Sequence, residues 1–409
     1  MTPLKLSFSL NVVCVVFLIG LMSGCTGEKD VAESDTDADT RDQGERPEVN
    51  LSAADKVCDL LSAPINIQPI EGIRGREIVG SPQWLVDNDT IVYADSGDAW
   101  SYQLSEGKPR CLTCSFDDPA VVHRVNVLAD GSFILLGPAH ALEETSTLVH
   151  DAPSRLAGDT IWWLASDLET PPQSLGYRAF EMVATSRESM TMAWASGIAQ
   201  GDLVDAQTAM LSPPATLGAT AHVARIEVNA GTAHLLDVKE VYHWPHSIVQ
   251  VNNFLPGDSG LALTTFWSLE RRFYPTSEEL QQGSYTSNDA EAWTLDLASG
   301  ELINQSQSPG FDEFEGLHPD GQFAFLESTR ASESLDLHVL ALGSAGQQTR
   351  PLTSRGTLDG SGAADQVVFD ASFSPDGRRG VLGLGLSANV QRSIPNHTNL
   401  ALIEFECGE

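Results

Sequence analysis

Short runs of alternating apolar and polar residues fill the chain after Ala53, and tight turns join them in pairs. The pattern is clearest at Phe314–Glu327, which contains Pro319-Asp320-Gly321, and at Phe369–Leu386, which contains Pro375-Asp376-Gly377. Proline presets φ at the start of a turn and glycine accepts a positive φ, so each segment predicts a β-hairpin.

The hairpin recurs along the chain, with less regular turns toward the N-terminus. We predict hairpins at Ser81–Ala94, His123–Gly137, Tyr177–Ala195, His246–Trp267, Phe314–Glu327 and Phe369–Leu386. A further alternating strand follows each of them, at Ala99–Leu104, Ile161–Leu164, Ala224–Val228, Ala292–Leu297, Leu337–Leu342 and Leu400–Phe405. A fourth strand, such as Leu235–Val241, follows most of these. Four strands repeated about six times predict an all-β protein, a β-propeller of six four-stranded blades. The pattern leaves seven blades open, and a flat sandwich is the alternative fold.

The Pro-Asp-Gly hairpins resemble the repeats of TolB-like propellers, which are relatives of WD repeats. The resemblance covers roughly Ile70–Phe405 and is strongest at Phe314–Arg330 and Phe369–Leu382, whereas Tyr177–Ala195 departs from it. TolB-like propellers serve as envelope adaptors, so the resemblance implies a protein that binds a partner.

The two ends of the propeller are expected to close the ring. The last strand, Leu400–Phe405, has no following partner, and Pro64–Ile70 is a strand-like run before the first hairpin. Pairing the two would complete one blade and remove a sheet edge. It would also bring Cys58 beside Cys407, so we predict a disulfide between them, with a stabilisation on the order of 4–5 kcal/mol in the chain-entropy account. An oxidising compartment permits it.

Cys111-Leu112-Thr113-Cys114 is a second cysteine pair. In the cytosol this spacing could be a redox motif or half of a zinc site. The chain has no second pair of this kind and no helical pattern follows it, so we predict a local structural disulfide between Cys111 and Cys114.

The N-terminus carries a targeting pattern. Lys5 precedes an apolar run, Val12–Leu21, that is too short to span a membrane. Met22-Ser23-Gly24-Cys25 then resembles a bacterial lipobox, which implies cleavage before Cys25 and a diacylglyceryl group plus an N-acyl chain such as palmitate on that cysteine. Thr26 stands where an aspartate would retain the protein at the inner membrane, so the resemblance implies the outer membrane. A secreted protein cut elsewhere is the alternative.

These patterns divide the chain into a signal peptide at 1–24, a lipidated cysteine with an acidic tether at 25–52, and a propeller at 53–409. Glu28–Asn50 has almost no large apolar residue, which predicts a disordered tether. Asp35, Asp37 and Asp39 alternate like the start of a calcium loop, but the central glycine and closing glutamate are missing, so we interpret them as part of the linker.

Charge narrows the range of partners. The chain has 56 acidic and 23 basic residues among 409, a formal net charge of -33. Such a surface repels phosphate backbones, so we expect no nucleic-acid partner. Acidity also keeps a protein soluble, and it leaves binding of a cation or a basic partner open.

Propeller topology sorts the loops onto two faces. The hairpin turns lie on one face, and the loops between second and third strands and between blades lie on the other. Two long insertions, Ser196–His222 and Ser268–Glu291, belong to this second face. Long loops on a rigid scaffold often carry function, although tolerated surface drift explains them equally well.

Polar residues of the inter-blade loops gather near the predicted channel mouth on the second face; they include Asp117, Asp118, Asp312, Glu313 and Asp370. The candidate ligand-binding residues are His123, Arg178, His243, His246, Arg271, Arg272, Tyr274 and Glu315. Within His243-Trp244-Pro245-His246, the two imidazoles could hold a divalent metal with nearby carboxylates. Ordinary rim residues that hydrogen-bond loop backbone are the alternative.

We find no catalytic signature. Gly257-Asp258-Ser259-Gly260 matches the nucleophile tetrapeptide of trypsin-like proteases, but it falls on a predicted hairpin turn and continues as Leu-Ala-Leu. No Gly-x-Ser-x-Gly, Walker loop or dinucleotide fingerprint is present.

We therefore expect a non-enzymatic, monomeric propeller in the bacterial cell envelope, without a cofactor and attached to the outer membrane through its lipid only. It would bind an envelope protein or a glycan on the long-loop face. The alternative is a metal-dependent propeller enzyme, such as a polysaccharide lyase, that uses His243 and His246.

Overall fold

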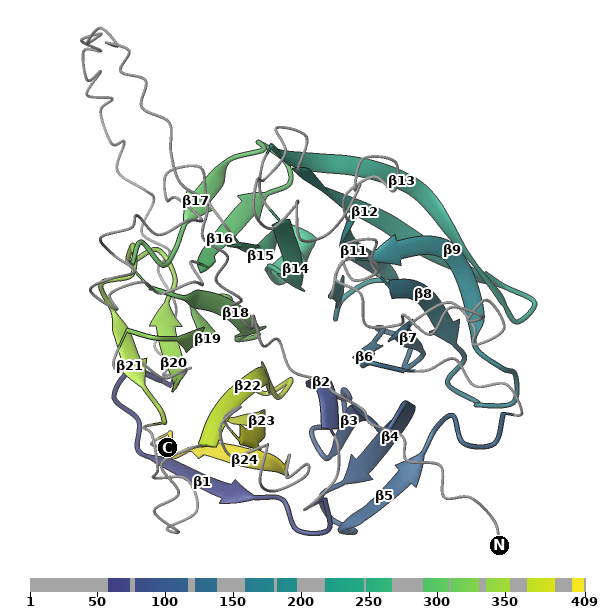
Figure 1. Cartoon of the computed structure of the whole chain (residues 1–409), viewed down its shortest axis with the longest axis horizontal. Helices are drawn as coiled ribbons and strands as arrows, with labels where there is room; N and C mark the ends of the chain where they lie inside the picture. The colour runs from purple at the N-terminus through teal and green to yellow at the C-terminus, as the bar shows by residue number, and fades with distance from the viewer. Residues whose placement is uncertain are drawn as a thin grey trace, which may run out of the picture. The chain divides into compact units, whose positions relative to one another are not determined.

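The computed structural model describes residues 58–73, 78–116, 122–137, 159–179, 182–196, 218–245, 248–266, 290–308, 310–330, 336–353, 366–386 and 399–407. The described strands all belong to the compact unit Asp59–Glu409. They form six four-stranded antiparallel sheets around a common centre, as Figure 1 shows. The prediction of a six-bladed propeller is confirmed. The signal peptide, Cys25 and the tether lie outside the described residues. Within the described part of the chain, no helix has the length and apolarity needed to cross a membrane.

Each blade runs from the centre outward. The innermost strands are β2 (Ile78–Trp84), β6 (Arg124–Val127), β10 (Val183–Thr185), β14 (Ile248–Phe254), β18 (Asp312–Leu317) and β22 (Gln366–Phe373). The second strands are β3 (Thr90–Asp95), β7 (Phe133–Gly137), β11 (Thr191–Ser196), β15 (Gly260–Phe266), β19 (Phe323–Ser328) and β23 (Arg379–Leu386). We number the blades 1 to 6 in the order of these strands.

The third strands are β4 (Asp98–Gln103), β8 (Asp159–Leu164), β12 (Gly218–Asn229), β16 (Ala290–Asp296), β20 (Asp336–Ala341) and β24 (Asn399–Phe405). The outermost strands are β5 (Lys108–Cys111), β9 (Gln173–Ala179), β13 (Thr232–Pro245), β17 (Leu302–Asn304), β21 (Thr349–Pro351) and β1 (Ile65–Pro69).

The N- and C-terminal strands close the ring, as the sequence predicted. β1 pairs antiparallel with β24, from Ile65 opposite Phe405 to Pro69 opposite Ala401. Arg350, on the outermost strand of blade 5, donates a hydrogen bond of 3.0 Å to Leu60 O and another to Ala63 O. The segment before β1 is therefore attached to blade 5 as well as to blade 6.

The core lies between neighbouring blades. Between blades 2 and 3, Ile134 and Trp163 pack in one cluster with Val183 and Trp194, each at most 4% exposed. Because a blade contacts a neighbour on both of its faces, its middle strands are apolar in continuous runs. All five residues of β7 are buried, for example.

Two predicted details differ from the structure. The hairpin predicted at Tyr177–Ala195 begins too early, because Tyr177 belongs to β9, the outermost strand of blade 2. The innermost strand of blade 3 has only three residues, Val183–Thr185, which is too short to give an alternating pattern of its own.

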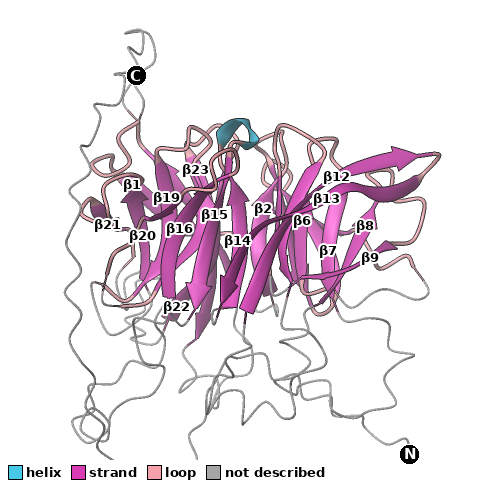
Figure 2. Cartoon of the chain, turned by 90° about the horizontal axis from the view of Figure 1, so that it is seen from above, coloured by secondary structure: helices cyan, strands magenta, loops and turns pink. Residues whose placement is uncertain are grey.

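The turn at Pro256–Asp258 is a short 3-10 helix, η2, which Figure 2 shows in cyan.

Candidate functional site

Neighbouring hairpin turns are hydrogen-bonded to one another on one face of the ring, here called the turn face. Ser189 Oγ donates to Asp258 Oδ2 over 2.6 Å, which joins blades 3 and 4. His318 Nε2 lies 3.2 Å from Gly377 O, between blades 5 and 6. Asp376 N donates to Asn88 Oδ1 over 3.0 Å, between blades 6 and 1. In Figure 2 the turns of this face lie along the same edge as η2.

One side chain also crosses the centre of the turn face. Arg187, in the hairpin turn of blade 3, donates through Nη2 to Phe373 O of blade 6 over 2.7 Å. Blades 3 and 6 stand opposite each other in a ring of six. These polar groups of the turn face therefore bond to other blades.

Three successive innermost strands carry a β-bulge, and the extra residue is polar each time. The register shifts at Asn252 in β14, at Glu315 in β18 and at Asp370 in β22. Asp370 has a φ of 47°, a left-handed conformation that aspartate tolerates better than most residues. Bulges redirect side chains and occur often beside functional sites, so they single out the centre of the ring.

A carboxylate cluster lies at this level of blade 5. Glu313 and Glu327 are paired in the β18–β19 ladder. Glu315, two residues after Glu313, is the extra residue of the bulge in β18. Each of the three offers an oxygen within 4.8 Å of the others. Glu315 is 2% exposed and Glu327 7%. We call Glu313, Glu315 and Glu327 the glutamate cluster.

Burial dominates the electrostatics of the cluster. It raises the pKa of Glu315 and of Glu327 well above the usual range, and the neighbouring charges of Glu313 and Asp370 raise both further. A hydrogen bond with Glu315 opposes the shift at Glu327. The two buried carboxyl groups therefore hold protons more tightly than exposed glutamates do.

Arg124 supplies a positive charge nearby. Its Nη1 atom lies 2.9 Å from Asp370 Oδ1, and both side chains are mostly buried. Arg124 begins β6 of blade 2 and Asp370 belongs to β22 of blade 6, so the pair reaches past blade 1 at the centre of the ring. Its charge lowers the pKa of both glutamates but is outweighed by their burial.

One oxygen of the cluster has no partner. Glu315 Oε2 is buried and accepts no hydrogen bond from the described residues. Leaving such an atom unpaired costs about 1–3 kcal/mol, and more when the group is charged. Folded proteins rarely keep this arrangement without a use for it.

The predicted ligand-binding residues occupy different places. His123 directly precedes β6, with Nδ1 3.2 Å from Asp159 Oδ2. Arg178 and His243 are exposed on the outermost strands β9 and β13, and His243 Nδ1 lies 3.0 Å from Thr220 Oγ1. Of the described candidates, Glu315 alone joins the central cluster. His246, Arg271, Arg272 and Tyr274 lie outside the described residues, so the metal hypothesis for His243 and His246 stays a prediction.

Neither Glu327 nor Arg124 was predicted from the sequence. Glu327 comes near the end of the buried strand Phe323–Ser328, where an acidic side chain breaks an apolar run. That break was a usable signal. Arg124 gave none, because its partner Asp370 is distant in sequence and only the closed ring brings them together.

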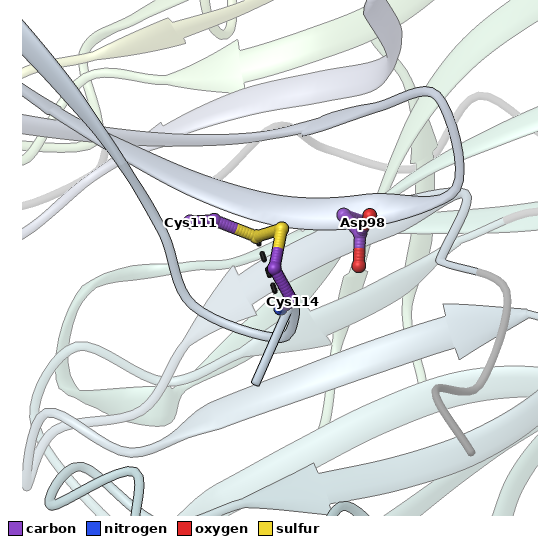
Figure 3. A group of neighbouring side chains, drawn as sticks. All are labelled: Asp98, Cys111 and Cys114. Carbon is purple, nitrogen blue, oxygen red and sulfur yellow. Dashed lines mark hydrogen bonds between the residues drawn. A yellow bond between two sulfur atoms is a disulfide. The ribbon is translucent and has the colours of Figure 1, made fainter. Parts of the chain in front are cut away.

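A second group of potential metal ligands, Asp98, Cys111 and Cys114, appears in Figure 3. The two sulfur atoms form the predicted local disulfide, with an S–S distance of 1.95 Å. Thr113 Oγ1 donates to Asp98 Oδ1 over 2.7 Å and accepts from Ala99 N over 3.0 Å. Because thiolates and not disulfide sulfurs bind metals, this group serves the structure of blade 1.

The remaining predicted features have structural explanations or stay predictions. Ser259, in the protease-like tetrapeptide, donates its hydroxyl to Pro256 O over 2.8 Å and so stabilises the turn. Cys58 and Cys407 are each disulfide-bonded. Their pairing with each other stays a prediction.

Comparisons with known proteins do not assign a function. No family model matches the sequence, and no curated protein matches it. Among solved structures, TolB from Acinetobacter baumannii is similar at 11% identity with a TM-score of 0.40, over 84% of this chain and 66% of TolB. This chain thus spans just under two thirds of that protein.

Enzymes with a similar architecture are found too. A gluconolactonase from Xanthomonas campestris matches at 12% identity and a TM-score of 0.45, over 83% of this chain and 90% of that chain. A luciferin-regenerating enzyme matches at 11% and 0.45, over 83% and 95%. At these identities and TM-scores, the likeness says nothing about function.

Proposed function

We propose that the protein is a lipid-anchored, non-enzymatic propeller of the bacterial envelope that binds a protein or glycan partner. The partner would approach the face opposite the turn face, here called the insertion face. The proposal depends mainly on one observation, the difference between the two faces. The turn face uses its polar groups to join the blades, whereas the other end of the central strands holds the glutamate cluster and the Arg124–Asp370 pair.

The position of the cluster supports binding from the insertion face. Glu313 lies near the start of β18 and Glu327 near the end of β19, both away from the Pro319-Asp320-Gly321 turn. The sequence also assigns the insertions Ser196–His222 and Ser268–Glu291 to this face, although most of their residues lie outside the described part. Concentrated charge at the centre of a rigid ring is suited to recognising a partner of opposite charge.

Charge reversal on each face tests this proposal. The intact lipoprotein would be crosslinked in the envelope and captured as wild type, Glu313→Lys and Glu106→Lys. Glu106 is exposed in the turn between β4 and β5, so it gives a matched charge reversal on the turn face. We expect Glu313→Lys to reduce capture of a partner at least tenfold and Glu106→Lys to leave it unchanged. Equal capture by all three proteins, or loss only with Glu106→Lys, would contradict the proposal.

The anchor needs its own test. The lipobox resemblance at Met22–Cys25 supports acylation of Cys25 and a location at the outer membrane. We expect wild type to partition with membranes and Cys25→Ala to appear in the soluble fraction. A Cys25→Ala protein that still partitions with membranes would exclude the lipid anchor.

A metal-dependent enzyme is the second candidate, and the glutamate cluster is the observation that favours it. Carboxylates that gather around a bound ion can position water or substrate. Turnover of a polysaccharide panel by wild type, lost in Glu315→Gln, would favour the enzyme over the adaptor.

A further inference from the structure

We infer that Glu313, Glu315 and Glu327 form a binding site for one divalent cation that prefers oxygen ligands, with Ca²⁺ the best fit. The site goes beyond the proposed partner binding and does not depend on it. Four independent features of the glutamate cluster support it.

The spacing of the three carboxylates suits a single ion. One oxygen from each lies within 4.8 Å of one oxygen of the others. Calcium–oxygen distances are about 2.3–2.6 Å, so two oxygens on the same ion are at most about 5 Å apart. The three side chains therefore need only small rotations to coordinate one ion together.

The backbone holds these side chains in place. Glu313 and Glu327 are directly opposed in the β18–β19 ladder, and the bulge adds Glu315 to the same strand. Gly316, the next residue, packs so closely on blade 6 that a Cβ atom there would come within 2.8 Å of Ala371 O. Blades 5 and 6 thus fix the bulge from both sides, and a preorganised site loses little entropy on binding.

The unpartnered oxygen points to a missing ligand. Glu315 Oε2 is buried, accepts no hydrogen bond from the described residues, and belongs to a side chain within the cluster. A cation would satisfy this oxygen, because carboxylate oxygens are the ligands that hard divalent cations take.

Charge and ligand type select the class of cation. All three ligands are carboxylates, a hard donor set that suits Ca²⁺, Mg²⁺ or Mn²⁺ and disfavours zinc. The nearby Arg124 guanidinium is already paired with a fourth carboxylate, that of Asp370. Calcium tolerates irregular coordination completed by water, whereas magnesium requires nearly ideal octahedral geometry.

Calcium titration calorimetry tests the inference. The complete chain would be treated with EDTA, exchanged into metal-free buffer with 0.15 M NaCl and titrated with CaCl₂. Wild type should bind one equivalent saturably, and Glu315→Gln and Glu327→Gln should each weaken binding at least tenfold. Glu106→Gln, at an exposed turn, is the matched control for the generally acidic surface and should bind as wild type does.

Thermal unfolding provides the second measurement. Saturating CaCl₂ should raise the melting temperature of wild type and of Glu106→Gln but not that of Glu315→Gln. Melting of Glu315→Gln in EDTA as a single transition shows that it is folded. No saturable calcium binding by wild type, or equal binding by wild type and Glu315→Gln, would overturn the cation site. Either result would leave the proposed partner binding in place, because partner capture is measured separately.

Discussion

Asp312 and Glu313 are adjacent on β18, yet their carboxylates have opposite surroundings. Asp312 is fully buried and receives hydrogen bonds from Arg330 Nε at 2.9 Å, from Ser328 Oγ at 2.7 Å and from Ser308 Oγ. Glu313 faces the other side of the strand, where it meets the like charges of Glu315 and Glu327.

The difference distinguishes a structural carboxylate from a ligand-binding one. The fold surrounds Asp312 with donors, and Arg330 in turn donates to Ser306 O and to Gly346 O, which ties the loops of blades 4 and 5 together. Glu315 is buried to a similar degree, yet its Oε2 atom accepts no hydrogen bond from the described residues. Both sites bury carboxylates. The number of hydrogen-bond donors around each carboxylate is therefore what distinguishes the structural site from the candidate binding site.

Removing the structural carboxylate should give the largest effect. Asp312→Ala leaves the Arg330 guanidinium buried without its counter-ion, and we expect a loss of about 3–5 kcal/mol in the free energy of unfolding. Urea denaturation of wild type and variant measures it. The double variant Asp312→Leu, Arg330→Met should recover part of the loss. A loss of less than about 1 kcal/mol in Asp312→Ala would show that Asp312 does not have this structural role.

At the glutamate cluster, in contrast to Asp312, replacing a buried carboxylate should raise stability, and the gain should depend on pH. The folded-state pKa values of Glu315 and Glu327 lie above the ordinary 4.5, so the folded chain holds protons that the unfolded chain releases. In metal-free buffer, wild type should therefore lose stability as the pH rises from about 4.5 through these raised values. The difference in melting temperature between Glu315→Gln and wild type should grow over the same range. A difference independent of pH would contradict the raised pKa.

His338 provides a smaller test of the same principle. It is 2% exposed on β20, and neither ring nitrogen has a hydrogen-bond partner among the described residues. Burial lowers its pKa, so the unfolded chain gains a proton first as the pH falls below 6.5, and folding loses stability there. We expect His338→Met to raise stability by about 1 kcal/mol at neutral pH and by more near pH 5.5. Chemical denaturation at both pH values measures this, and a destabilised variant would indicate that the imidazole has a role.

The smallest effect should come from an exposed ion pair. Arg225 Nη2 lies 3.6 Å from Asp237 Oδ2, with side chains 57% and 70% exposed. Solvent screens such a pair, so Arg225→Ala should change the free energy of unfolding by less than about 0.5 kcal/mol. The same denaturation series measures it, and a loss as large as that of Asp312→Ala would show that burial and partner supply are not what separates these sites.

The fold could be predicted from the sequence because its signals are local. A Pro-Asp-Gly turn and its two flanking strands lie within about twenty residues, and the closing strand was identified because β24 needed a partner. Blade 3 was misplaced because its short inner strand gives almost no periodic signal.

The candidate site was predicted only in part because its contacts are not local. Glu315 was a candidate by its place near an inner strand. The bulge that positions it, the facing Glu327 and the pair that Arg124 makes with Asp370 all depend on pairing across strands or blades. His243 was expected near the channel mouth, but the structure places it on the outermost strand β13. Its role with His246 in metal binding stays a prediction.

The unfolding free energy of Glu315→Gln in EDTA near pH 8 tests the comparison most directly. If the cluster is kept for a ligand, replacing one buried carboxylate by a neutral amide should leave the metal-free protein as stable as wild type or more stable by about 1–3 kcal/mol. A loss comparable to that of Asp312→Ala would contradict the account, because it would show that the fold depends on the Glu315 charge as it does on that of Asp312.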